Sequence, residues 1–168
     1  MGTSLYDLSV PVYARALRNL SLILAKGAAF AAEQGIDPAD LLATRLAEDM
    51  AALPYQVQRA CDSAKGTVVR VGGVDNKIFE DNEATFDELQ ARIAGVIAFI
   101  EAVPRAAMEG KEEDVVILDL PTGKYEFTGR SFVLSFAIPN FFFHVTMAYA
   151  LLRHRGVPLG KLDYLGGL

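Results

Sequence analysis

The sequence predicts an all-α protein, a four-helix bundle with a small β-hairpin between the third and fourth helices. Two observations carry this prediction. Four segments place apolar residues at helical spacing and are joined by short connections, as in a bundle. Between the third and fourth segments the period changes to the alternation of a half-buried strand. The chain, residues 1–168, suits a single domain with one core.

The first helix is predicted over residues 4–34. Pro11 is expected to start its regular part or to kink it. Gly35 follows the segment and is a natural residue for a helix C-terminus. The apolar residues that recur at helical spacing here are Leu17, Leu20, Ile23, Leu24 and Ala31.

The second helix is predicted to begin at Asp37, an N-cap residue, with Pro38 in its first turn. Pro54 interrupts the segment and is expected to bend the helix, which ends at the glycine pair 72–73. One continuous apolar stripe is expected along it, formed by Leu46, Met50, Leu53, Val57, Cys61, Ala64, Val68 and Val71.

The third helix is predicted to start at Thr85, because Thr85 and Glu88 have the spacing of a capping box, and Pro104 closes it. The segments VVILDL and KYEFTG then flank the turn PTG, which indicates a β-hairpin. Because a lone hairpin is marginally stable in water, it is expected to lean on the bundle.

The fourth helix is predicted over residues 129–155, and it contains an uncharged stretch at 132–152 that is long enough to span a membrane. The distribution of side chains around the helix argues against a span. His144 shares an apolar face with Asn140, whereas the opposite face carries hydroxyls, aromatic rings and Arg153. This segment is therefore expected to be a core helix of a soluble bundle.

Composition excludes some classes of partner and favours a cytoplasmic protein. The net charge of −5 argues against nucleic acid as a partner, because phosphate neutralisation needs a basic face. The single cysteine, Cys61, allows no internal disulfide and fits a reducing compartment. The N-terminal segment does not have the pattern of a signal peptide. The three consecutive phenylalanines at 141–143 place aromatic rings around the helix, so a homodimer interface is also expected.

Four polar residues are the candidates for a ligand-binding site. His144 and Asn140 lie one turn apart on the inward face of the last helix, and Gln56 and Asp49 lie beside the apolar stripe of the second helix, placed to face them. An unsatisfied buried polar group costs about 1–3 kcal/mol, so these side chains must bond to one another or bind something. The cores of helical bundles hold ligands and metals in this manner.

Three interpretations of His144 stay open: a hydrogen-bonded core residue, the wall of a ligand pocket, or a metal ligand. A protein metal site needs three or four histidine, cysteine or carboxylate ligands. The chain has two histidines, and His154, among cations at a helix end, has the pattern of a cap. No metal site is therefore assigned, and His144 is the one residue that would belong to it. Cys61 lies on the apolar stripe and is interpreted as a small buried hydrophobe.

Several stretches together resemble the DinB-like (YfiT-like) superfamily and, more closely, a bacterial domain-of-unknown-function family within it. The stretches that carry the resemblance are SLYDLSVPVYARALRNLSLIL, LAEDMAALPYQVQRACDSAKG, FEDNEATFDELQARI and PNFFFHVTMAYALLRHRGVPLGKLDYLG. The resemblance covers essentially the whole chain. It implies a four-helix bundle, commonly assembled as a homodimer.

The resemblance also implies chemistry that the residues only partly match. Many members of the superfamily bind nickel or zinc through three histidines, one from the second helix and two, four residues apart, from the last. Some act as thiol-dependent transferases or isomerases. In this chain His144, nine residues before Arg153, stands where the final histidine would be. Asn140 stands one turn earlier and Gln56 occupies roughly the region of the second-helix histidine, so one of the three ligands is present. The fold therefore transfers to this chain, whereas the metal and the chemistry do not.

Three functional hypotheses follow, and the sequence leaves open whether the protein is an enzyme. The first is a DinB-like bundle with a small-molecule pocket around His144, Asn140, Gln56 and Asp49 and a degenerate or absent metal site. The second is a metal-dependent transferase or isomerase that recruits carboxylates such as Asp49 in place of histidines. The third is a non-catalytic dimeric interaction protein whose polar core residues only fix helix register.

Overall fold

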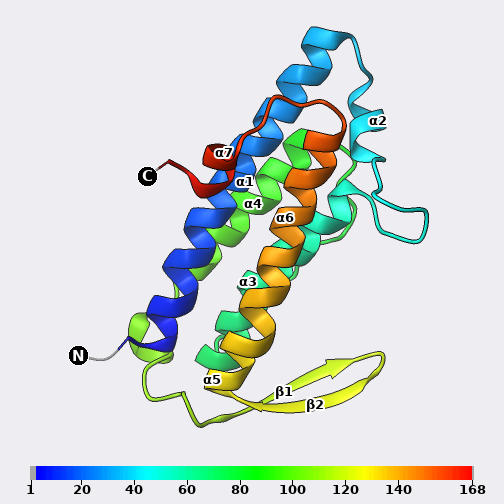
Figure 1. The fold of residues 1–168 in the computed structure, drawn as a ribbon. Helices are drawn as coiled ribbons and strands as arrows, with labels where there is room; N and C mark the ends of the chain where they lie inside the picture. The colour runs from blue at the N-terminus through cyan, green and yellow to red at the C-terminus, as the bar shows by residue number, and fades with distance from the viewer. Residues whose placement is uncertain (1–2, 168) are drawn as a thin grey trace.

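Four long helices form the body of the protein, and a two-stranded hairpin lies at one end (Figure 1). The structure is a computed structural model that describes residues 3–167. The helices are α1 (Leu5–Gln34), α2 (Pro38–Leu42), α3 (Leu53–Gly72), α4 (Phe86–Glu101), α5 (Gly129–Ser131), α6 (Ile138–His154) and α7 (Lys161–Leu165), and the strands are β1 (Val115–Leu120) and β2 (Gly123–Thr128). The predicted all-α bundle with one hairpin is confirmed.

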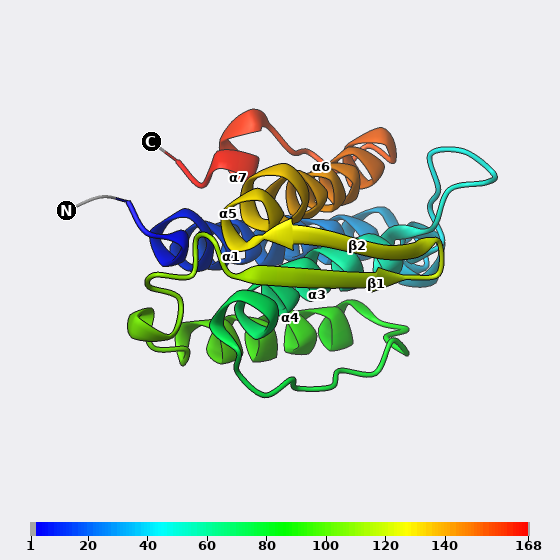
Figure 2. The ribbon, with the colours of Figure 1, turned by 90° about the horizontal axis from the view of Figure 1, so that it is seen from below.

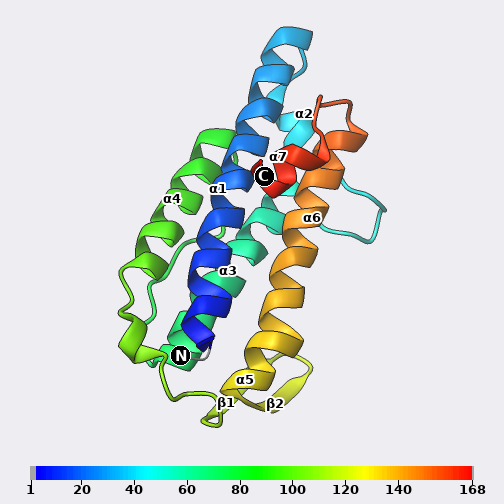
Figure 3. The ribbon, with the colours of Figure 1, turned by 60° about the vertical axis from the view of Figure 1, so that its left-hand side comes forward.

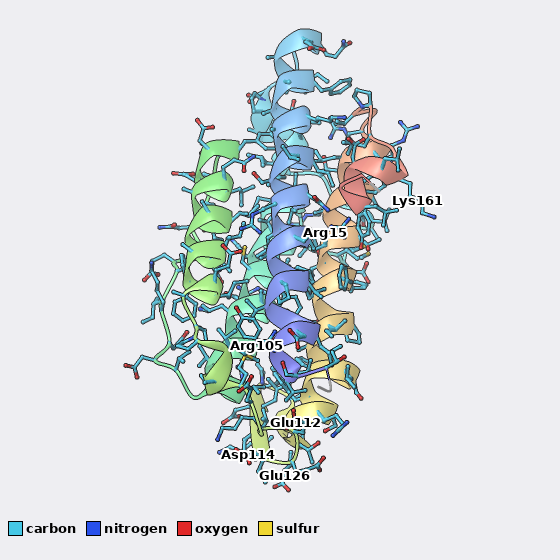
Figure 4. All side chains as sticks on the ribbon, turned by 90° about the vertical axis from the view of Figure 1, so that its left-hand side faces the viewer. Arg15, Arg105, Glu112, Asp114, Glu126 and Lys161 are labelled. Atoms are coloured by element: carbon cyan, nitrogen blue, oxygen red, sulfur yellow. The ribbon has the colours of Figure 1, made fainter. Side chains whose placement is uncertain are left out.

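The first helix follows its prediction closely. Ser4 caps α1 and forms a capping box with Asp7, and Gly35 ends the helix at a φ of 64°. Pro11 does not start the regular part, because α1 is already helical from Leu5. The Arg105 side chain reaches the same helix end from a short 3₁₀ turn, where it pairs with Asp7 (Figure 4).

The predicted continuous second helix is wrong. The chain forms the short α2, leaves helical geometry over residues 43–52, and starts α3 at Leu53 with Pro54 in the first turn. Proline inside a helix removes a backbone hydrogen bond and costs about 3 kcal/mol, whereas the first turn has no intrahelical partner for that N–H. The break takes Leu46 and Met50 off the expected stripe, and Leu46 is exposed.

The third helix and the hairpin match their predictions with small differences. Thr85 caps α4 in a capping box with Glu88, but the helix ends at Glu101, before Pro104. The strands pair antiparallel, with Val116 opposite Phe127 and Leu118 opposite Tyr125. In the view from below, the hairpin crosses the end of the bundle, between α5 and α6 on one side and α3 and α4 on the other (Figure 2).

The fourth helix is helical from Gly129 to His154, but it contains a π-helical segment, Phe132–Ala137, that was not predicted. The N–H of Ile138 bonds to the carbonyl of Val133, five residues earlier, and Pro139 follows with no N–H to donate. A π-helical turn before a proline accommodates the missing donor without ending the helix.

Gly129–His154 is the one helix, within residues 3–167, that is long and apolar enough to cross a membrane by length and composition. Core helices of soluble proteins pass the same test. This helix packs against α3 and α1 in the bundle, and its buried residues include Phe141, Val145 and Leu151. The side-by-side packing of α1, α4 and α6 is plain in Figure 3, where α7 folds back over α1 and α6. Lys26 of α1 pairs with Asp163 of α7 at 2.6 Å.

Candidate functional site

His144 and Gln56 form a direct hydrogen bond between α6 and α3. The His144 Nδ1 atom lies 2.8 Å from Oε1 of Gln56, whose side chain is almost completely buried. The Gln56 Nε2 group donates to the carbonyl of Ala51 at 3.0 Å. Since that carbonyl can only accept, the amide must point its oxygen at His144. Nδ1 of His144 therefore carries the proton and donates it, and the lone pair is on Nε2.

The surroundings of His144 keep its ring neutral. Burial, together with a smaller contribution from the nearby Arg59 cation, lowers the pKa of His144 from 6.5 to about 4. The ring meets Phe143 and Tyr55 edge to face, at centroid distances of 5.2 and 6.2 Å. Within residues 3–167 the Nε2 atom makes no hydrogen bond. It is therefore an uncharged acceptor near neutral pH.

We expect His144 to make folding sensitive to acid. The unfolded chain binds a proton at pH values near 6.5, whereas the folded chain does so only near 4, so unfolding takes up a proton between these values. Stability is then fully present above about pH 6.5 and falls as the pH drops toward 4. Urea unfolding across this range should show the slope in the wild type and a smaller slope in His144→Gln. Equal slopes in the two proteins would contradict the assigned pKa.

Asn140 forms a second hydrogen-bonded contact between the same two helices. Its Nδ2 group donates to the Ser63 hydroxyl at 2.6 Å, and that hydroxyl donates to the carbonyl of Arg59 at 2.9 Å. Three of the four residues expected at the site therefore lie at the interface of α3 and α6, in two separate pairs. Asp49 is exposed on the non-helical segment 43–52, and within residues 3–167 it makes no hydrogen bond to the other three.

A groove of about 520 Å³ begins at Asn140 and extends toward the hairpin. Its walls come from α3, the N-terminal half of the last helix, β1 and residues 74–84, a segment that we call the strap. The charged residues of the lining are Arg59, Lys65, Arg70, Asp62 and Asp81, and its apolar side chains include Leu118, Leu120, Phe132, Phe136, Ile78 and Phe79. His144 and Gln56 do not line it; they lie beyond Arg59.

Ion pairs hold the strap against the bundle. Arg92 of α4, whose side chain is 1% exposed, contacts Asp81 and Glu83 of the strap at 2.9 Å and Asp62 of α3 at 3.0 Å. Arg59 pairs with Asp81 and with Asp62. One buried guanidinium thus joins α3, α4 and the strap, and it fixes one wall of the groove.

The groove residues on α3 were missed by the sequence reasoning, although a signal for them existed. Arg59, Ser63, Gly66 and Arg70 recur every three or four residues, which places them on one face of a helix. This polar face runs beside the apolar stripe. Charged side chains on one face of a helix usually point into solvent, so this pattern alone does not distinguish a groove wall from an ordinary exposed face.

The residues around His144 do not fit the three-histidine metal site that the superfamily implies. Within residues 3–167, no three histidine, cysteine or carboxylate side chains are placed so that they could hold a metal ion. The residue that faces His144 is Gln56, whose amide oxygen accepts a hydrogen bond from the Nδ1–H group of the imidazole ring. Cys61 is buried, as expected, and burial raises the pKa of its thiol to about 12. It is therefore not a thiolate near neutral pH.

Comparison with known proteins agrees with this architecture. The family described as "Domain of unknown function (DUF1993)" matches residues 5–165. The crystal structure of a DinB family member protein from Shewanella denitrificans is similar to this chain, with 40% sequence identity and a TM-score of 0.90. The match covers 98% of this chain and 93% of that one. No curated protein matches the chain.

Proposed function

Because the chain belongs to the DUF1993 family and has the fold of a DinB family member, we propose that it binds a small organic molecule in the groove beside Asn140. The observation that carries the proposal is the groove itself. Its volume of about 520 Å³ lies within the range of small-molecule sites, and polar groups at one end face apolar walls at the other. That combination orients a ligand that has one polar end.

The polar end of the groove supplies hydrogen-bonding groups that are already positioned. Ser63 is held between Asn140 and the carbonyl of Arg59, so the Asn140 amide keeps a fixed direction. The Asn140 oxygen and its second N–H remain for a ligand, since one N–H is used by Ser63. Such preorganised groups bind with little loss of side-chain entropy.

The proposal contains no metal-dependent step. The donors present around His144 are one imidazole and one amide, and they already bond to each other. A transferase or isomerase mechanism through nickel or zinc would need three or four protein ligands, and the described residues around His144 do not form such a group.

The homodimer and the cytoplasmic location stay predictions. Of the three phenylalanines expected to reach a second copy, Phe141 is buried, Phe142 is half-buried and Phe143 is 53% exposed. Phe143 is therefore the member of the run that supports a contact with another molecule, next to the exposed ring of Tyr55.

A fragment screen followed by protein NMR tests the proposed site. We expect bound fragments to shift the amide resonances of Ser63, Gly66 and Asn140. Asn140→Ala should weaken these fragments about tenfold, the loss for a hydrogen bond worth about 1.4 kcal/mol. Asn82→Ala is the matched control, because Asn82 is exposed on the strap and does not line the groove. Fragments that bind elsewhere, or no binding at all, would refute the proposal.

A further inference from the structure

Arg70 differs from the other two cations of the groove because no carboxylate among the described residues pairs with it. Arg59 pairs with Asp62 and Asp81, and Lys65 lies 3.8 Å from Asp62 and donates to the carbonyl of Lys77. Within residues 3–167, no carboxylate lies within 4 Å of the Arg70 guanidinium. The Arg70 side chain is exposed at the groove, where partial burial lowers its pKa and the charge of Asp62 opposes that shift without cancelling it.

The Arg70 side chain lies against the surface of α3, in the space left by the missing side chain of Gly66. Its Nη1 group donates to the carbonyl of Gly66 at 3.2 Å, and a Cβ atom at position 66 would overlap the guanidinium. The guanidinium carbon also lies 6.0 Å from the centre of the Phe132 ring. Glycine inside a helix costs about 1 kcal/mol relative to alanine. Here it makes room for a positioned cation.

The apolar part of the groove lies next to this cation. Phe132 and Phe136 stack at a centroid distance of 5.8 Å. Ile78 of the strap and Leu120 of the hairpin also line the groove, and they are 75% and 37% exposed. Ile78 and Leu120 therefore offer apolar surface to a ligand, whereas Phe136 is half-buried and Phe132 is buried beneath it as the floor of this part of the groove.

We propose that the groove selects an amphipathic monoanion, a carboxylate on an aryl or alkyl body, with Arg70 as the residue that binds the carboxylate. This inference rests on the proposed function and deepens it. A planar guanidinium matches a carboxylate through two parallel hydrogen bonds. Three cations and two carboxylates line the groove, so it favours a single negative charge, whereas Asp62 and Asp81 oppose a phosphate dianion. The aromatic and aliphatic walls then bury the apolar body.

The test uses four probes of known chemistry, with binding measured by titration calorimetry at low ionic strength. The probes are 4-phenylbutyrate, 4-phenylbutan-1-ol, 4-phenylbutylamine and inorganic phosphate. We expect 4-phenylbutyrate to bind at least about tenfold more tightly than the alcohol, as a charge-assisted hydrogen bond implies. The amine and phosphate should bind more weakly still.

Two variants separate the role of Arg70 from the stability of the fold. Arg70→Gln should lower the affinity for 4-phenylbutyrate about tenfold and leave that for the alcohol unchanged. Gly66→Ala should displace the guanidinium, which is the end of a flexible side chain, and lower the affinity similarly. The same change should raise the Tm by about 2–4 °C, because alanine favours the helix. Arg153→Gln, an exposed cation of α6, is the matched control and should change neither value.

Equal affinities for the acid and the alcohol, or an unchanged affinity in Arg70→Gln, would overturn this inference. Failure of 4-phenylbutyrate to bind would overturn it as well. None of these three results refutes the proposed function if neutral or cationic fragments still shift the resonances of Ser63 and Asn140. That pattern would leave a small-molecule groove with a different selectivity.

Discussion

Replacing Arg92 by leucine is expected to lower the free energy of unfolding by about 3–5 kcal/mol, the loss seen when one partner of a buried ion pair is removed. Arg92 is the buried cation between Asp62, Asp81 and Glu83, and it also donates to the carbonyl of Glu80. Its loss leaves carboxylates close together with too little positive charge. Urea unfolding followed by circular dichroism measures the change.

Two further variants show whether this effect belongs to the ion-pair cluster. Arg92→Lys keeps the charge but cannot contact all three carboxylates in the same fork geometry, so an intermediate loss is expected. Arg18→Gln removes an exposed pair with Glu101 and should cost at most about 1 kcal/mol. Amide hydrogen exchange should rise over the strap in Arg92→Leu. A loss as small as that of Arg18→Gln would show that the cluster does not hold the strap.

Gly129→Ala is expected to destabilise the protein by about 3 kcal/mol, at the upper end of the usual cost of overpacking. Gly129 is buried at the junction between β2 and α5, and a Cβ atom there would overlap the carbonyl oxygen of Lys111. The backbone cannot yield cheaply, because the N–H of Gly129 donates to the carbonyl of Asp114 at 2.8 Å and that of Arg130 to Glu112 at 2.9 Å.

Gly72→Ala provides the control for this prediction, because a Cβ atom at position 72 makes only ordinary contacts, the nearest at 3.4 Å to Met108. It should leave stability unchanged or raise it slightly. Differential scanning calorimetry compares the two variants. In Gly129→Ala the hairpin should also show faster hydrogen exchange, and binding in the groove should weaken because Leu118 and Leu120 line it. Equal melting temperatures for both variants would contradict the steric argument.

Much of the fold could be predicted because the signals that define it are local. The capping box at Thr85, the glycine at 35 and the hairpin sequences each act over a few residues, and the structure confirms them. The helix break before Pro54 was misjudged because a proline permits two outcomes, a kink or a first turn, and the local pattern does not distinguish them.

The site was predictable only in part because it depends on distances between helices. Helical periodicity placed His144 and Gln56 toward each other, and they form a hydrogen bond. The pairing of Asn140 with Ser63, and the absence of a carboxylate beside Arg70, depend on how α6 lies along α3. The sequence pattern of a single helix does not predict how far one helix is shifted along another. Asp49 was expected near His144 because the second helix was drawn as continuous.

The π-helical segment Phe132–Ala137 belongs both to the groove wall and to the core, in which Phe132, Val133 and Ala137 are buried. One extra residue in a helix turns everything on one side of it by roughly 100° relative to the other side. The helix before the extra residue sets the direction of the Phe132 and Phe136 rings. The helix after it sets the contacts of Asn140 and His144 with α3, so the two directions are independent of each other. A single insertion or deletion within 132–137 would re-aim the aromatic wall and leave the core of α6 in register. Relatives of this chain could in this way change what they bind while keeping the same bundle.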